Sequence, residues 1–381
     1  MHAWKLLKEG KWEAVNFRDY IDTNGIKKDA FEEMRNSHLP LYIYGAGNLA
    51  VNIKNKLEEH GINLEGCITD SGQEKFFGYK VYKYDEFTAE MESGSCNLLI
   101  GFASAYERKA ALEKEEVFYK IYEIANPFDH HAHFDRKFVE ECSQQLEEAY
   151  ELFEDEYSRE CFCGFINARI WENADYVRHV FRGEMDEFNN DITKTGPEEV
   201  FLDVGAYQGG SIQRFLRSNM GRYEKIIGIE PEKDNFNRLQ VFCKENGINA
   251  ELHCVGCWNK TDRLAFQGNA DKCCRLAADG SEYINVEPID NIVGEECAVS
   301  FINIGISTAE KEILEGAKRT ICYNLPKIMV FMGSAREELY LLPRLIKQLN
   351  HSYKLYLRFI QAMPSRVFMY AVPDRERQDL T

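Results

Sequence analysis

The sequence lacks the features of a secreted or membrane-spanning chain. It has no apolar run long enough to cross a bilayer, and its opening residues, MHAWKLLKEGKWEAVNF, contain neither the apolar stretch nor the small-residue cleavage site of a secretory signal. Its 12 cysteines in 381 residues follow no regular spacing. We therefore expect a cytoplasmic protein with reduced thiols and without structural disulfides.

Positive charge is also scarce. Lys and Arg total 46 against 63 Asp and Glu, which gives a net charge of -17. This balance opposes attraction to phosphate backbones and anionic lipids, so we expect neither a nucleic-acid nor a membrane partner. A small-molecule or sugar-nucleotide ligand is expected instead, and self-association into a homo-oligomer stays open.

The length and the pattern of apolar segments predict two α/β domains. A chain of 381 residues exceeds the size at which one core usually stops growing. Apolar, strand-like runs alternate with amphipathic, helix-like stretches near residues 40 to 125 and again from about 198, which is typical of parallel sheets covered by helices. We predict two Rossmann-like domains, 1–135 and 198–381, joined by a helical connector at 136–197.

The first domain contains a glycine turn between a strand and a helix. The strand Leu41–Tyr44 leads into Gly45 and Gly47, and Asp70 falls at the end of the next strand. Such a turn lets the backbone approach a phosphate, while the acid accepts from ribose hydroxyls. We predict a nucleotide site of these three residues. A turn that binds nothing, and a nicotinamide-dependent oxidoreductase, are the alternatives.

The stretch LPLYIYGAGNLAVNIKNKLEEHGINLEGCITDS, with the later strand LLIGFAS, resembles the N-terminal domains of sugar O-acyltransferases that recognise nucleotide-sugars. The resemblance covers about the first 125 residues. It implies a nucleotide or a sugar-nucleotide as the ligand of this domain.

A second glycine turn opens the C-terminal domain. The strand Val200–Val204 brings Asp203 to the turn Gly205–Gly210, and the following strand, Lys225–Ile229, ends at Glu230. An acid before the first glycine would repel a pyrophosphate but suits the cationic amino group of S-adenosylmethionine, whose ribose hydroxyls Glu230 is placed to bind. The pattern therefore favours S-adenosylmethionine over a dinucleotide.

The second domain resembles the FkbM-type S-adenosylmethionine-dependent methyltransferases. The resemblance is carried by FLDVGAYQGGSI, IGIEPEKDNFNRL, GCWN, VEPIDNIV, FINIGISTAEKEILEGAKRTI, LPKIMVF and LPRLIKQLNHSYKLYLRF. It implies a class I methyltransferase fold that ends in an antiparallel hairpin, for which YKLYLRF and SRVFMYAV are the strand candidates. By position, the cofactor residues it implies are Asp203, Gly205, Glu230, and Gly256 and Cys257 in a strand-end turn. We also predict a cofactor contact for Asn303, which stands where the family has a lysine.

One motif departs from the family. Where the family has acids, this sequence has Gly305 and Ser307, with Thr308 in place of a glycine, and only Glu310 is kept. Glu310 and Asp290 are the candidate catalytic bases, although each also fits a helix cap, Glu310 in a capping box with Ser307 and Asp290 as the N-cap of NIVGEE. We predict O-methylation of a small-molecule or glycan-related acceptor; the alternative is a non-catalytic protein that binds the cofactor or a nucleotide-sugar.

Two clusters have metal-ligand residue types without a convincing site. His130, His131 and His133 stand in NPFDHHAHFDRKF, which a polar surface loop explains better. Cys254 and Cys257 are separated from Cys273 and Cys274 by WNKTDRLAFQGNADK, which we interpret as a strand and loop of the main sheet. We predict no metal.

Overall fold

The computed structural model describes residues 17–22, 29–72, 74–102, 105–125, 134–267, 275–276, 282–306, 309–333, 335–363 and 366–374. The chain divides into two compact α/β units. The first comprises Met1–Ser143, Glu160–Gly183 and Gln361–Arg366, and the second comprises Gln144–Arg159, Glu184–Ile360 and Val367–Thr381. The predicted connector is therefore not a separate unit, because its residues are shared between the two.

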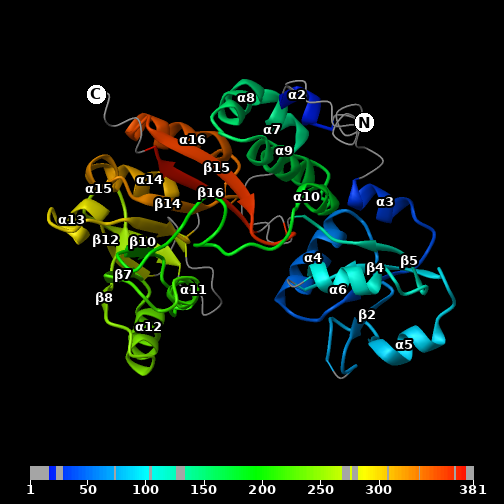
Figure 1. The fold of residues 1–381 in the computed structure, drawn as a ribbon. Coiled ribbons are helices and arrows are strands. Elements are labelled where there is room, and N and C mark those ends of the chain that lie inside the picture. The colour runs from blue at the N-terminus through cyan, green and yellow to red at the C-terminus, as the bar shows by residue number, and fades with distance from the viewer. Residues whose placement is uncertain are drawn as a thin grey trace. The chain divides into compact units, whose positions relative to one another are not determined.

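The first unit is built on a five-stranded parallel sheet with the order β3-β2-β1-β4-β5 (Figure 1). Its strands are β1 Leu41–Tyr44, β2 Gly66–Thr69, β3 Val81–Lys83, β4 Cys96–Ile100 and β5 Phe118–Tyr122. Its helices in the first 142 residues are α2 Phe17–Tyr20, α3 Ala30–Asn36, α4 Asn48–Glu59, α5 Tyr84–Glu90, α6 Ala105–Leu112 and α7 Arg136–Glu141. The strand order reverses between β1 and β4, so this unit has a switch point at the carboxyl ends of those strands.

The second unit contains a seven-stranded sheet with the order β15-β16-β14-β13-β6-β7-β8. The strands are β6 Val200–Val204, β7 Lys225–Ile229, β8 Ala250–His253, β13 Phe301–Ile304, β14 Lys327–Phe331, β15 Tyr353–Phe359 and β16 Val367–Pro373. All pairs are parallel except those of β16, which runs antiparallel to β14 and β15. This confirms the predicted fold with its terminal hairpin.

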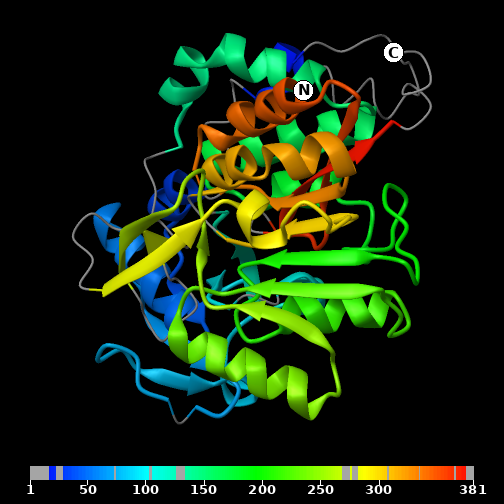
Figure 2. The same ribbon diagram turned by 90° about the vertical axis from the view of Figure 1, so that its left-hand side faces the viewer.

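The helices of this unit follow the strands in the expected alternation. They are α11 Gly210–Ser218, α12 Lys233–Glu245, α13 Ile289–Val293, α14 Glu310–Gly316, α15 Lys318–Asn324 and α16 Glu338–Leu349. On one face of the sheet, Phe201 and Phe301 from neighbouring strands pack with Phe215 of α11 and Leu239 of α12, all fully buried. Figure 2 shows these two helices, in green and yellow-green, beside the strands of the sheet. All residues of β6 and β13 are buried, as expected for central strands of a parallel sheet that is covered on both faces.

A separate small sheet corrects one expectation. The strands β9 Gly256–Cys257, β10 Asp262–Gln267, β11 Arg275–Leu276 and β12 Glu282–Glu287 form a four-stranded sheet of their own, in the order β11-β10-β12-β9. The prediction that the segment after Cys257 belongs to the main sheet is therefore wrong. The segment pairs with β12, about 20 residues further along the chain, through an antiparallel ladder between Asp262 and Val286 at one end and Phe266 and Glu282 at the other.

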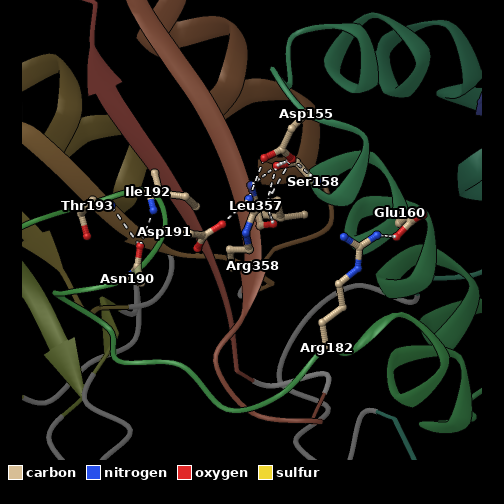
Figure 3. Close-up of polar contacts among 10 residues, drawn as sticks. All are labelled: Asp155, Ser158, Glu160, Arg182, Asn190, Asp191, Ile192, Thr193, Leu357 and Arg358. Carbon is tan, nitrogen blue, oxygen red and sulfur yellow. Dashed lines mark hydrogen bonds and ion pairs between the residues drawn. The ribbon is translucent and has the colours of Figure 1, made fainter.

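Three helices lie between the predicted connector boundaries after α7: α8 Ser143–Glu151, α9 Glu156–Ile170 and α10 Asp175–Val180. Within the second unit, the start of α9 is fixed to β15 by Arg358, which is 2% exposed (Figure 3). Its guanidinium donates to Asp155 at 2.6 and 3.2 Å, to the Ser158 hydroxyl at 2.8 Å and to Asp191 at 3.1 Å. A buried guanidinium with two carboxylates holds these distant segments in one arrangement.

The described residues contain no helix that is long and apolar enough to span a membrane. In the same part of the chain, the cysteines are free thiols. There, too, no three or more His, Cys, Asp or Glu side chains come together as a metal would require. His130, His131 and His133 lie outside the described residues, as do Cys273 and Cys274.

Candidate functional site

The loop after β6 is closed over the end of β7. The backbone N–H groups of Gly205 and Ala206 both donate to the carbonyl of Ile229 at 3.0 Å. Gly205 has φ +81°, and a Cβ at this position would lie 2.1 Å from Cγ2 of Ile306. Glycine is therefore required here both by its backbone conformation and by the side chain packed against it.

Glu230 ties the same loop to the start of the next helix. It follows β7, is 5% exposed, and accepts from the backbone N–H of Tyr207 at 2.9 Å and of Glu232 at 3.0 Å. Burial raises its pKa to about 7, and the two backbone hydrogen bonds oppose this shift. A carboxylate held in this way keeps lone pairs for further donors at the carboxyl edge of the sheet.

Asp203 is enclosed beneath the loop. It is fully buried; one oxygen accepts from the Nδ2 of Asn303 at 2.7 Å and the other accepts from the Ser211 hydroxyl. Burial raises its pKa to about 6, and both side-chain hydrogen bonds lower it. The sequence predicts direct contact with the cofactor's amino group. In the structure, Asp203 is fully buried and orders the start of α11 and the side chain of Asn303.

Asn303 lies opposite Asp203 in the parallel ladder between β13 and β6. Asn303 is 4% exposed, and its Nδ2 donates a hydrogen bond to Asp203. Its Oδ1 has no hydrogen-bond partner among the described residues. A buried, unsatisfied carbonyl oxygen is costly unless a ligand or water donates to it, so Asn303 presents an acceptor at this edge.

Comparison with known families gives this edge its context. Residues 203–354 match the family model of the methyltransferase FkbM domain. The chain carries an FkbM methyltransferase domain. This domain implies S-adenosylmethionine as its cofactor. The residues present fit that molecule, because Glu230 and the Oδ1 of Asn303 are acceptors for hydroxyl and ammonium donors.

A solved structure that matches nearly the whole chain supports the fold. The methyltransferase FkbM of Methylobacillus flagellatus KT is 18% identical, with a TM-score of 0.67 over 97% of this chain and 98% of the other. An rRNA methylase of Streptococcus thermophilus matches 47% of this chain and 87% of its own (15% identity, TM-score 0.30). The precorrin-6y C5,15-methyltransferase of Geobacter metallireducens GS-15 matches 54% and 89% (12% identity, TM-score 0.29). A search of curated proteins finds no match.

Two predicted cofactor residues of the FkbM domain take a different place. Gly256 and Cys257 do not form the turn after β8; they form β9, which pairs in parallel with β12. Cys257 is buried, and burial raises the pKa of its thiol. The turn itself consists of Cys254 and Val255. Pairing with β12 depends on a distant segment, so spacing from β8 could not place these two residues.

The candidate base Asp290 is occupied elsewhere. It lies in the first turn of α13, and its carboxylate accepts from the backbone N–H groups of Arg319 and Thr320 at 2.7 and 2.9 Å and from the Thr320 hydroxyl at 2.8 Å. Asp290 therefore caps α15. The alternative interpretation, in which it caps the N-terminus of α13, is wrong. With three donors on its oxygens, Asp290 is a poor proton acceptor, and the prediction of a catalytic role is not supported by its geometry.

Glu310 is the first residue of α14 and is 1% exposed. The N-cap is Ala309, so Glu310 does not occupy the third helical position that a capping box requires. Gly305 follows β13 and donates to the carbonyl of Val204 at 3.0 Å. Ser307 and Thr308 lie outside the described residues. Among the described residues, Glu310 is thus the acid that directly follows this turn in sequence.

The glycine turn of the first unit is also formed as predicted in its local structure. Gly45 follows β1 with φ +113°, and Gly47 is the N-cap of the 12-residue helix α4. Asp70 comes directly after β2, and its side chain is 85% exposed. Sequence reasoning missed Tyr44 and Arg108, which contact this acid. No local motif identifies Arg108, because it is far from Asp70 in sequence and reaches the end of β2 only through the position of α6 in the fold.

Proposed function

We propose that the FkbM domain transfers a methyl group from S-adenosylmethionine to an oxygen atom of a small-molecule or glycan-related acceptor. The observation that carries the proposal is the buried carboxylate of Glu230, fixed by two backbone N–H groups beside the Gly205 loop. When bound, the cofactor supplies an electrophilic methyl group on its sulfonium sulfur. Glu230 accepts from the ribose hydroxyls and so orients the cofactor beside the loop after β6.

Asn303 binds the positive end of the cofactor in this proposal. Its Oδ1 is the buried acceptor without a partner among the described residues, and its Nδ2 is oriented by Asp203. A carboxylate behind the amide makes the carbonyl oxygen a better acceptor for an ammonium group. Asp203 is thus a positioning residue that acts through Asn303.

Glu310 is the proposed general base. A hydroxyl acceptor has to lose its proton during methyl transfer, and a carboxylate at the start of α14 can take it. Replacing Glu310 by Gln keeps the shape and removes the base, so we expect methyl transfer to fall by roughly a hundredfold or more while cofactor affinity is unchanged. Incubation with 13C-methyl-labelled S-adenosylmethionine and fractionated small molecules, read by NMR, measures the product and distinguishes oxygen from nitrogen or sulfur as the methylated atom. Unchanged turnover in Glu310→Gln would exclude Glu310 as the base.

Calorimetric titration with S-adenosylhomocysteine tests the cofactor site. We expect saturable binding that Glu230→Gln weakens by about tenfold or more, because one charge-assisted acceptor is lost. Glu296→Gln is the matched control, since Glu296 is exposed in the segment after α13. Failure of the unaltered protein to bind would contradict the proposal.

A non-catalytic, cofactor-binding protein is the second candidate. It is favoured by Gly305, which has no side chain where the family has an acid, and by the apolar Ile306 that follows and packs on Gly205. Binding of S-adenosylhomocysteine without transfer of label to any fraction would support this second function over the first.

A further inference from the structure

Four side chains of the first unit meet at the carboxyl edge of its sheet. Tyr44 ends β1, Asp70 follows β2, Tyr84 begins α5 directly after β3, and Arg108 lies on α6, which follows β4. The Tyr44 hydroxyl donates to Asp70 and accepts from Nη2 of Arg108 at 2.5 Å. Four separate connections of a doubly wound sheet therefore contribute to one cluster, at the edge where such sheets bind ligands.

The guanidinium of Arg108 lies against two aromatic rings. Its central carbon is 4.9 Å from the ring centroid of Tyr84 and 5.4 Å from that of Tyr44, and the two rings stack at 5.2 Å. The side chain is 40% exposed. Stacking on rings restricts the guanidinium without using its N–H donors, and one donation to Tyr44 leaves donors for a ligand.

Asp70 provides the opposite chemistry next to this cation. One of its oxygens lies 3.6 Å from Nη2 of Arg108, and its side chain is 85% exposed. An exposed carboxylate disfavours phosphate but accepts well from hydroxyl donors. The pair therefore suits a ligand that carries both hydroxyl groups and an anionic group a short distance apart.

The backbone beside the cluster consists of glycines without side chains. A Cβ at Gly45 would lie 3.0 Å from the carbonyl oxygen of Gly101, and one at Gly101 would lie 2.9 Å from that of Tyr44, so the ends of β1 and β4 come together at the switch point. Gly47 has open space around it and gives α4 no side-chain cap. The first N–H groups of α4 are consequently available to an anion.

We propose that this edge binds a nucleoside diphosphate group, either free or attached to a sugar. Asp70 accepts from the ribose hydroxyls, and Arg108 together with the start of α4 binds the phosphates. This site is separate from the methyl-transfer site and does not depend on it. In a chain with a net charge of -17, the local cation is what allows an anionic ligand to bind here.

Calorimetry on the full chain tests the site, with ADP, GDP, CDP and UDP as probes, adenosine and uridine as phosphate-free probes, and inorganic pyrophosphate. We expect saturable binding of at least one diphosphate, weakened tenfold or more by Arg108→Ala. Arg238→Ala, at an exposed position of α12, should leave it unchanged. Asp70→Asn should weaken the nucleoside diphosphate but not pyrophosphate. Thermal unfolding compared with that of the unaltered chain checks that Arg108→Ala and Asp70→Asn leave the first unit folded.

Three results would overturn the proposal: no binding of any diphosphate at millimolar concentration, equal binding of the phosphate-free nucleosides, or a diphosphate affinity that Arg108→Ala does not change. A preference for NAD+ over every nucleoside diphosphate would also overturn it, in favour of a dinucleotide. UDP-glucose compared with UDP separates the two sources of the ligand: tighter binding of UDP-glucose supports the sugar-linked form, and equal or weaker binding supports the free diphosphate.

Discussion

The two glycine turns of this chain have the same order of elements but different construction. Each follows an apolar strand, leads into a helix and is followed one strand later by an acid, Asp70 in the first unit and Glu230 in the second. Glu230 is 5% exposed and binds the backbone of its own loop, whereas the Asp70 side chain is 85% exposed and is held by Tyr44. The same pattern thus produces a backbone-ordered turn in one unit and a side-chain cluster in the other.

Alanine substitutions at the two turns should differ most in their effects on stability and on cofactor binding. Gly205→Ala forces φ +81° on a residue with a Cβ and drives that Cβ into Ile306. We expect the unfolding free energy to fall by about 2 to 4 kcal/mol and S-adenosylhomocysteine binding to fall at least about a hundredfold. Gly47→Ala, in open space, should change stability by less than about 1 kcal/mol. Chemical denaturation and calorimetry measure both effects; equal effects of the two substitutions would contradict this account.

The buried asparagines of the two sheets allow a matched test. Asn303→Leu leaves Asp203 with one donor fewer, so we expect a loss of about 1 to 3 kcal/mol in stability together with weaker S-adenosylhomocysteine binding. Asn97 on β4 is similarly buried; its Nδ2 donates to the Ser37 hydroxyl at 2.7 Å, and its Oδ1 likewise has no partner among the described residues, but it belongs to the first unit. Asn97→Leu should lower stability without changing cofactor affinity. If both variants bind S-adenosylhomocysteine as the unaltered chain does, Asn303 is structural only.

The smallest expected effect is a dependence of cofactor affinity on pH. Burial raises the pKa of Glu230 from its ordinary value of 4.5 to about 7. The folded protein therefore holds this proton more tightly than the unfolded chain, and stability falls as the pH rises from 4.5 through 7. The ionised form is the better acceptor for ribose hydroxyls. We expect S-adenosylhomocysteine to bind about tenfold more weakly at pH 6 than at pH 8. Glu230→Gln should flatten this profile; Asp203, with a pKa of about 6, contributes mainly below pH 6.

Local patterns predicted the strands next to the glycine turns correctly. Leu41–Tyr44, Val200–Val204 and Lys225–Ile229 are strands with the predicted bounds, because each apolar run is ended by a glycine or by Glu230 and Pro231. The hairpin of β15 and β16 was implied by the resemblance to the FkbM-type methyltransferases, and the structure confirms it. The strand bounds depend on neighbours in sequence, which a single chain reveals.

Contacts between distant segments explain what the sequence could not reveal. Asp203 accepts a hydrogen bond from Asn303, a residue 100 positions away, and Asp290 accepts from the backbone at the start of α15. The connector was predicted as one segment, yet Arg358 binds Asp155 across 203 positions and ties part of it to β15. Such pairings follow from the fold, so the spacing of motifs could not reveal the partners that Asp203 and Asp290 have inside the protein.

The position of Glu230 beneath its loop has a consequence for the heat of binding. A carboxyl group with a pKa of about 7 is protonated in about half of the molecules at pH 7. A ligand that selects the ionised form therefore releases about half a proton to the solvent at this pH. The measured enthalpy will include the ionisation heat of the buffer, and titrations in phosphate and in Tris will differ by that amount. Cofactor and product share the ribose, so the proton stays released through the reaction and returns only when the site empties.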